Sequence, residues 1–173
     1  MSKVFVSIAL SLDGYMASEG ITMHRPEYEN WGSTTERIGA NIVGRRMFDQ
    51  GEISWPGDAP FHTSVYVLMN EKREPWAHPG GTTFHFVNDG PARALGMARE
   101  SAGIREIRVA GGADVLQQYL DLGVVDELEI AMAPVLFGGG RRLCENLREP
   151  VPRFRIDQVL DGPAATHLRC VRQ

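Results

Sequence analysis

The stretch RVAGGADVLQQYL, Arg108–Leu120, joins a strand-like run of apolar residues to a helix-like run through two glycines. In an open parallel sheet, ligands bind beyond the carboxyl ends of the strands. Gly111 and Gly112 lack β-carbons, so a ligand oxygen can approach their backbone, and the following helix would present free N–H groups to an anion. The stretch by itself leaves two interpretations open: a plain tight turn between strand and helix, or a phosphate-binding loop.

Strand-like and helix-like runs alternate on both sides of this stretch. The pattern predicts helices over residues 33–40, 90–103 and 113–123, the first from a capping-box sequence that begins at Ser33. The tail, residues 153–172, has two strand-like runs around an Asp-Gly-Pro turn, which is typical of a hairpin. The other predicted strands are residues 4–10, 41–48, 64–70, 82–88, 104–111 and 125–137.

This alternation predicts an α/β fold with a mostly parallel central sheet between layers of helices and an antiparallel C-terminal edge hairpin. No linker-like segment or repeat interrupts the pattern, so residues 1–173 are predicted to form a single domain. An apolar strand in the terminal hairpin also favours edge-to-edge pairing of two copies, so a homodimer is expected.

The composition is that of an ordinary globular protein, with 43% hydrophobic and 23% charged residues. A formal net charge of -4 argues against a general nucleic-acid-binding role, and no apolar run approaches the length of a membrane span. Cys144 and Cys170 give neither a disulfide framework nor a metal site, and the five histidines lack metal-ligand spacing. We therefore expect a cytoplasmic protein that acts on a small molecule and binds no metal, membrane or nucleic acid.

Glycines or basic residues follow three of the predicted strands directly. Arg45 and Arg46 directly follow Gly44, the glycine into which the strand-like stretch 41–48 runs, and Lys72 and Arg73 come just after the next strand. Arginine forks suit phosphate oxygens, and lysine supplies a point charge. Each basic pair alone is typical of a solvated surface. Together with the glycine loop, in a chain of net negative charge, they favour a ligand with several phosphates, such as a dinucleotide that carries a 2′-phosphate.

The order of these motifs resembles the dihydrofolate reductase superfamily, and more closely its branch related to the reductase domain of riboflavin biosynthesis. The motifs cover the chain nearly from end to end. The resemblance implies a dihydrofolate reductase-like three-layer fold and a reductase that uses NADPH. The motifs are SIALSLDGYMA (residues 7–17), IVGRRMFD (42–49), YVLMNEKRE (66–74), RVAGGADVLQQYL (108–120) and VDELEIAMAPVLFGGG (125–140).

The resemblance also implies which residues hold the cofactor. The glycine loop and the helix start would bind the pyrophosphate, and the segment after the third strand would flank the adenosine 2′-phosphate. The first strand and a lid over residues 16–29 would frame the nicotinamide. The predicted cofactor-binding residues are Ala9, Leu12, Met16, Ala17, Gly44, Arg45, Arg46, Met47, Asn70, Lys72, Arg73, Val109, Gly111, Gly112, Ala113, Asp114 and Val115.

The same resemblance leaves the substrate open. Glu27 and Glu29 lie near the position of the carboxylate of dihydrofolate reductases but in a different local motif, and Ala110 stands where riboflavin-pathway reductases usually carry glutamate. We predict a small, flat substrate with a C=N or C=O bond, either pterin-like or ribosylamino-pyrimidine-like. Asp13 is the predicted catalytic residue. The predicted substrate-binding residues are Trp31, Phe61 and His62.

Two alternatives come from other functional classes. A non-catalytic nucleotide-binding module would keep the phosphate site without a proton donor. An enzyme of phosphate esters would use the basic strand ends, although the sequence offers it no metal-binding carboxylate cluster and no nucleophile. A second glycine cluster, residues 138–140, precedes Arg141 and Arg142 and is interpreted as a wide turn rather than a phosphate site.

Overall fold

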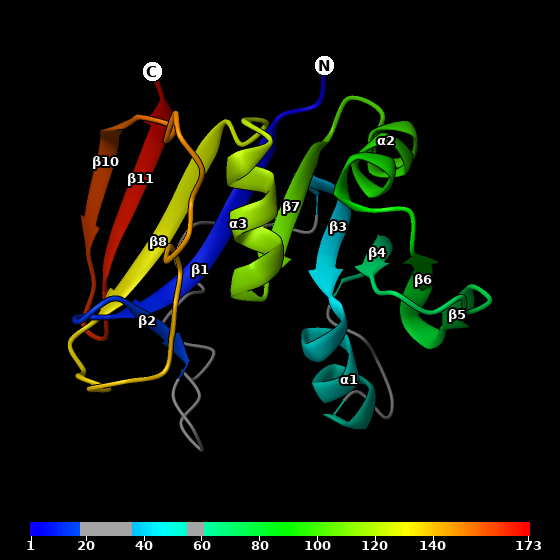
Figure 1. Cartoon of the computed structure of the whole chain (residues 1–173), viewed down its shortest axis with the longest axis horizontal. Helices are drawn as coiled ribbons and strands as arrows, with labels where there is room; N and C mark the ends of the chain where they lie inside the picture. The colour runs from blue at the N-terminus through cyan, green and yellow to red at the C-terminus, as the bar shows by residue number, and fades with distance from the viewer. Residues whose placement is uncertain (18–35, 55–60) are drawn as a thin grey trace.

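A nine-stranded mixed sheet forms the centre of the molecule (Figure 1). The computed structural model describes residues 1–17, 36–54 and 61–173. A separate ribbon pairs β2 (Tyr15–Ala17) with β9 (Arg141–Arg142). The strands of the large sheet are β1 (Val4–Ser11), β3 (Ile38–Gly44), β4 (Ser64–Leu68), β5 (Trp76–His78), β6 (Thr82–Val87), β7 (Glu106–Gly111), β8 (Glu127–Ala133), β10 (Phe154–Asp161) and β11 (Thr166–Arg172).

The middle of the large sheet is parallel, and both of its ends are antiparallel. The strand order is β10-β11-β8-β1-β7-β3-β4-β6-β5. All neighbours from β8 to β6 pair in parallel. β5 pairs antiparallel with β6, and β10 and β11 form an antiparallel hairpin beside β8. This arrangement confirms the predicted α/β fold and its C-terminal edge hairpin.

Helices pack on both faces of the sheet. α2 (Pro91–Ala102) and α3 (Ala113–Asp121) contribute to the larger hydrophobic core, and α1 (Arg45–Ser54) contributes Phe48 to a second core. Neighbouring residues of β3 belong to different cores, Ile42 to the larger one and Val43 to the second. Because successive side chains of a strand point to opposite faces, the two cores lie on opposite sides of the sheet. None of the described helices has the length and apolar character needed to cross a membrane.

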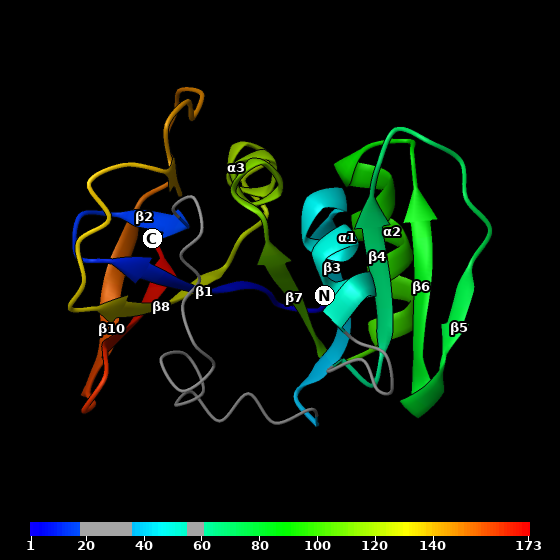
Figure 2. The same cartoon turned by 90° about the horizontal axis from the view of Figure 1, so that it is seen from below.

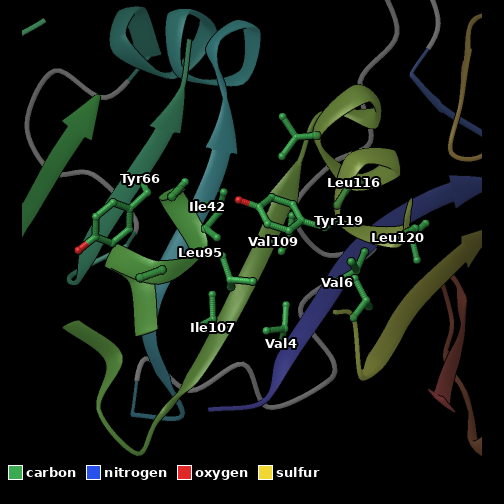
Figure 3. Close-up of a cluster of buried hydrophobic side chains, with 14 of the residues drawn as sticks. Val4, Val6, Ile42, Tyr66, Leu95, Ile107, Val109, Leu116, Tyr119 and Leu120 are labelled. Carbon is green, nitrogen blue, oxygen red and sulfur yellow. The ribbon is translucent and has the colours of Figure 1, made fainter. Parts of the chain in front are cut away.

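The larger core holds α3 against the middle of the sheet (Figure 3). Val4 and Val6 of β1 lie in the same cluster as Leu116 and Tyr119 of α3. Tyr119 is fully buried, and its hydroxyl donates a hydrogen bond of 2.9 Å to the carbonyl of Pro91, so its polar end is satisfied. Apolar burial at about 25 cal/mol per Å² therefore fixes α3, and with it the glycine loop at the start of this helix.

The structure corrects the predicted helix over residues 33–40. Residues 38–40 belong to β3, while residues 33–35 lie outside the described part of the chain. The capping box is a local signal, and the pairing of β3 with both β7 and β4 overrides it.

The second correction concerns the strand predicted over residues 41–48. The strand ends at Gly44, and α1 begins at Arg45. Only the buried residues before Gly44 carry the strand pattern, because the polar residues after it lie on an exposed helix surface. The short strands β2, β5 and β9 also escape sequence prediction, since two or three residues show no periodicity.

A buried network of charges joins the amino-terminal parts of several strands. Glu127 and Glu129 of β8 are 1% and 2% exposed. The guanidinium of Arg37 donates hydrogen bonds to Glu129 at 2.6 Å and to Glu127 at 3.3 Å, and it also donates to Glu106 at the start of β7. Burial raises the pKa of Glu129. Burial also acts to raise the pKa of Glu127, but the hydrogen bonds and charges of Lys3 and Arg169 together outweigh it, so this pKa is lowered. The network therefore links neighbouring strands at the edge opposite to the carboxyl ends of the parallel strands.

Candidate functional site

Four neighbouring strands bring the predicted cofactor-binding motifs to one edge of the sheet. β1, β7, β3 and β4 are adjacent, and they end at Ser11, Gly111, Gly44 and Leu68. Figure 2 views the molecule from the side on which β3 and β7 end in Figure 1. The segments that follow these four parallel strands therefore share the carboxyl edge, where ligands bind in open α/β sheets.

Gly44 packs against the glycine loop too closely to admit a side chain. A Cβ atom on Gly44 would lie 2.8 Å from Cγ2 of Val115, 3.5 Å from the amide nitrogen of Gly112 and 3.7 Å from the carbonyl oxygen of Gly111. Gly111 has a φ of 129°, which favours glycine, and its peptide bond to Gly112 is cis. The two glycine motifs of the sequence thus form one site, built by the ends of two adjacent strands.

Gly112 faces open space at the start of α3. A Cβ atom on Gly112 would meet no heavy atom of the described residues within 4 Å. The carbonyl of Gly112 accepts hydrogen bonds from the N–H groups of Val115 and Leu116, both at 3.1 Å. The N–H groups of Ala113 and Asp114 have no acceptor among the described residues. Free N–H groups at a helix start attract anions, so this corner fits a phosphate group.

Asp114 projects from the first turn of α3 and pairs with a cation from another loop. Its two carboxylate oxygens lie 2.9 and 3.1 Å from Nη1 of Arg141 in β9. The guanidinium balances a carboxylate that would otherwise repel a phosphate at the glycine loop. Sequence analysis did not indicate that Arg141 lies beside α3, because this position depends on the pairing of β9 with β2. The only local signal was the glycine cluster that precedes it.

Two of the predicted phosphate-binding cations are already engaged in ion pairs. Nη1 of Arg45 lies 2.9 Å from Glu71, which follows β4, so the segments after β3 and β4 are in contact. Nη2 of Arg73 lies 2.6 Å from Glu52 of α1, and its guanidinium stands 4.6 Å from the ring centroid of Phe86. These contacts give Arg73 a packing role in addition to its charge.

Arg46 and Lys72 are the cations that remain available. Both are exposed, and neither forms an ion pair with any residue in the described ranges. Asn70 is exposed beside Lys72. Arg46 follows β3 and Lys72 follows β4, the next two strands after β7 in the sheet order. A second phosphate at this carboxyl edge would meet both cations.

Met47 and Val109 have different relations to the site. The sulfur of Met47 lies 3.6 Å from the position that a Cβ atom on Gly111 would occupy, so Met47 borders the glycine loop. Val109 is fully buried in the larger core, two residues before Gly111 in β7, so it supports the glycine loop without lining it. Sequence spacing alone does not distinguish a residue that lines a site from one that supports it.

Asp13 links the turn after β1 to the loop after β8 by hydrogen bonds at the carboxyl edge. Its carboxylate accepts hydrogen bonds from the hydroxyl of Ser11 at 2.6 Å and from the backbone N–H groups of Phe137 at 3.2 Å and Gly138 at 2.8 Å. The hydrogen bond from Ser11, with those from the two amides, lowers the pKa of Asp13 to about 2. Asp13 therefore carries no proton to donate near neutral pH. Its predicted role in orienting substrate stays a prediction.

The residues predicted to frame the nicotinamide lie at the end of β1 and in β2. Ala9 belongs to β1, and Met16 and Ala17 belong to β2. Leu12, in the turn between them, is 60% exposed, and its N–H donates a hydrogen bond of 2.9 Å to the carbonyl of Val135. Met16 packs against the larger core. Leu12 thus places an exposed apolar side chain on the β1 side of the glycine loop.

Phe61 and His62 do not lie at the carboxyl edge. Both precede β4, so they lie at its amino end. Phe61 is 7% exposed and packs edge to face on Phe84 with a centroid distance of 6.3 Å, and Nδ1 of His62 lies 2.9 Å from the carbonyl oxygen of Gly80. Their predicted substrate-binding role stays a prediction, and their place at the amino end of β4 gives it no support.

Other predicted site residues lie outside the described part of the chain. These are Trp31 and the two candidate carboxylates, Glu27 and Glu29, together with most of the predicted lid. Within the described residues, no group of three or more His, Cys, Asp or Glu side chains is arranged to hold a metal ion.

The sequence profile of the RibD C-terminal domain family matches residues 2–168. Among curated proteins, the chain is similar to the uncharacterized protein YwjB of Bacillus subtilis (strain 168). The two are 24% identical over 176 residues, which cover 98% of each chain.

Solved structures share the fold over the whole chain. A putative riboflavin biosynthesis protein from Shewanella sp. PV-4 has a TM-score of 0.78 and 24% identity, with 100% of this chain and 99% of that chain covered. The dihydrofolate reductase of Enterococcus faecalis, complexed with NADP(H) and RAB-propyl, has a TM-score of 0.67 and 16% identity, with 98% and 96% covered. At these identities the likeness establishes the fold.

Proposed function

The chain belongs to the RibD C-terminal domain family, and from this premise we propose that it is an NADPH-dependent reductase. The proposal rests above all on the close packing of Gly44 against Val115 and Gly112, which leaves an open corner at a helix start. A side chain at Gly44 would collide with Val115, and one at Gly112 would fill the space that this proposal gives to a phosphate. NADP(H) is also the ligand named for the dihydrofolate reductase that shares this fold.

The order of the strand ends supports the same cofactor. Across the sheet, β1, β7, β3 and β4 carry in turn the apolar segment with Leu12, the glycine loop, and the exposed cations Arg46 and Lys72. NADPH presents its parts in the same order: an uncharged ring, a diphosphate and a 2′-phosphate. Matching charge and shape along four adjacent strand ends is a more specific signal than any single motif.

Each part of the site has a distinct task in this proposal. The N–H groups of Ala113 and Asp114 bind the diphosphate, and Arg46 and Lys72 bind the 2′-phosphate. Leu12, with its neighbours in β1 and β2, frames the nicotinamide ring. Bound NADPH supplies the hydride, and the protein aligns the cofactor with the substrate and excludes water.

We propose that the substrate is a small, flat heterocycle, pterin-like or ribosylamino-pyrimidine-like, reduced at a C=N or C=O bond. The family name and the name of the Shewanella protein, a putative riboflavin biosynthesis protein, support a substrate of this class. Asp13 is ionised near neutral pH, so in this proposal a water molecule supplies the proton. The role of Asp13 is to hold the turn after β1 against the loop that contains Gly138.

We also propose that two copies pair through the β10 edge of the sheet. β10 is the last strand in the sheet order and carries three exposed apolar side chains. Ile156 is 61% exposed, Val159 54% and Leu160 36%. An edge strand with exposed apolar side chains favours association, and a second copy would cover these side chains.

A turnover panel separates the reductase from a non-catalytic nucleotide-binding module. The purified protein is mixed with NADPH and, in turn, with oxidised pterins, ribosylamino-pyrimidines and simple imines and carbonyls, and the loss of reduced nicotinamide is followed. The proposal predicts consumption of NADPH with at least one member of the first two groups. Tight NADPH binding with no turnover on any member would instead favour the non-catalytic module.

A further inference from the structure

We infer that Arg141 is an additional ligand for the cofactor diphosphate, held at the glycine loop by Asp114. The inference rests on the proposed function, because it adds a residue to the same site. It assigns a binding role to the glycine cluster before β9, which the sequence pattern indicated only as a turn.

The contact with Asp114 places the guanidinium beside the anion-binding corner. Asp114 is the second residue of α3, and Gly112 directly precedes this helix. Nη1 of Arg141 lies 2.9 and 3.1 Å from the two carboxylate oxygens of Asp114. The charge of Arg141 therefore lies at the first turn of α3, where free N–H groups already favour an anion.

The guanidinium has donors left for a phosphate. An arginine side chain carries N–H donors on three nitrogen atoms. Both contacts with Asp114 use Nη1, and Nε and Nη2 of Arg141 have no acceptor among the described residues. Arg141 can therefore hold Asp114 and a phosphate oxygen at the same time. The carboxylate then orients the guanidinium and does not compete for it.

The backbone around Arg141 is fixed on both sides. On one side, the N–H of Gly138 donates a hydrogen bond of 2.8 Å to Asp13. On the other, the guanidinium of Arg142 lies 4.8 Å from the ring centroid of Tyr15 and donates a hydrogen bond of 3.1 Å to its hydroxyl. Arg141 is thus presented from a tethered loop, and a preorganised cation loses less conformational entropy on binding.

The ion pair of Arg141 with Asp114 contributes little to stability, so a structural role does not account for Arg141. The side chain of Arg141 is 45% exposed and that of Asp114 is 66% exposed. Exposed pairs of this kind contribute about 0–1 kcal/mol. A charge-assisted hydrogen bond to a phosphate is stronger than one between neutral groups. Binding is therefore the property that loss of this side chain should change most.

Titration of the full chain tests the assignment with two ligands. NADPH carries the diphosphate, whereas 2′-AMP carries only the phosphate that Arg46 and Lys72 would bind. Arg141→Gln is expected to raise the Kd for NADPH about tenfold and to leave the Kd for 2′-AMP unchanged. Arg141→Lys, which keeps the charge, should recover part of the lost affinity.

Arg148→Gln is the matched control. Nε of Arg148 lies 3.9 Å from Asp121, the last residue of α3, so this pair occupies the other end of the same helix. The control should leave both Kd values unchanged. The inference is overturned if Arg141→Gln binds NADPH within about twofold of the unaltered protein, or if it weakens 2′-AMP equally. Failure of the unaltered protein to bind NADPH would overturn the proposed function and this inference together.

Discussion

Gly44 and Val115 meet at the carboxyl edge of the sheet, and a Cβ atom on Gly44 would lie 2.8 Å from Cγ2 of Val115. The contact joins the end of β3 to the first turn of α3, two elements that belong to separate motifs in the sequence. It positions the glycine loop so that Gly112 faces open space and the helix start remains accessible. The proposed cofactor site depends on this contact.

Gly44→Ala should destabilise the protein by about 1–3 kcal/mol, because the new methyl group overpacks a buried contact. Val115→Ala alone should also destabilise, since it removes two buried methyl groups. In the double variant, the shortened side chain at position 115 makes room for the methyl group added at position 44. Denaturant unfolding should then show a loss smaller than the sum of the two single losses. Additive losses would contradict the contact.

Gly112→Ala should leave stability nearly unchanged and abolish NADPH binding. The Cβ atom meets no heavy atom of the described residues within 4 Å, so the folded chain admits it, but it occupies the space that the proposed function assigns to the diphosphate. Gly96→Ala, inside α2 and likewise without a close neighbour in the described ranges, is the control. It should stabilise the helix by about 0.5–1 kcal/mol and leave the Kd for NADPH as it was. Normal NADPH binding by Gly112→Ala would remove the glycine loop from the site.

Arg46→Gln and Lys72→Gln should each weaken NADPH binding about tenfold, or about 1.4 kcal/mol, while NADH binding stays the same. Both side chains are exposed, and only the 2′-phosphate distinguishes the two cofactors. Arg73→Gln should differ from them, because Arg73 packs on Phe86 and pairs with Glu52. It should lower the thermal midpoint as well. Equal losses of affinity for NADPH and for NADH would show that Arg46 and Lys72 do not bind the 2′-phosphate.

The buried carboxyl of Glu129 predicts a pH dependence of stability. Burial raises its pKa above the ordinary value of 4.5 in the folded chain. The folded state therefore holds this proton more tightly than the unfolded state. The stabilisation is complete below that value and is lost as the pH rises through the folded pKa. Glu129→Gln removes this titration.

Urea unfolding of both proteins across the acidic and neutral range checks this sign. The free energy of unfolding of Glu129→Gln, relative to that of the unaltered protein, should increase as the pH rises. A constant difference would mean that Glu129 does not titrate in this range.

Ile156→Lys or Val159→Lys should convert the expected homodimer into a monomer. Each substitution places a charge on an exposed apolar position of β10, where a second copy would bury it. Ile104→Lys is the control, because Ile104 is fully exposed and lies in the turn after α2. Light scattering on a sizing column gives the mass of each protein. A monomeric unaltered protein, or a dimeric Ile156→Lys, would contradict pairing through β10.

Much of the fold and part of the site follow from local sequence. The buried strands, α2, α3 and the terminal hairpin show clear periodicity or turn signals, and each is predicted near its observed place. The glycine loop is also a local signal, since a strand, two glycines and a helix follow one another directly.

The parts that sequence did not predict depend on contacts between distant segments. Arg141 reaches α3 only through the pairing of β9 with β2, and β9 is too short to show a pattern. Asp13 carries a turn signal, but its bonds to Phe137 and Gly138 come from the other end of the chain. Phe61 has an aromatic side chain of the kind that lines pockets for flat ligands. It precedes β4, at the amino end of that strand, and is buried in the second core.

Titration of the purified protein with NADPH and, separately, with NADH tests the central claim most directly. Quenching of tryptophan fluorescence, with energy transfer to the reduced nicotinamide, reports binding. We predict micromolar binding of NADPH, at least about tenfold tighter than that of NADH, a difference of about 1.4 kcal/mol. Binding of neither nucleotide would contradict the account, because the open corner at Gly112 would then hold no cofactor.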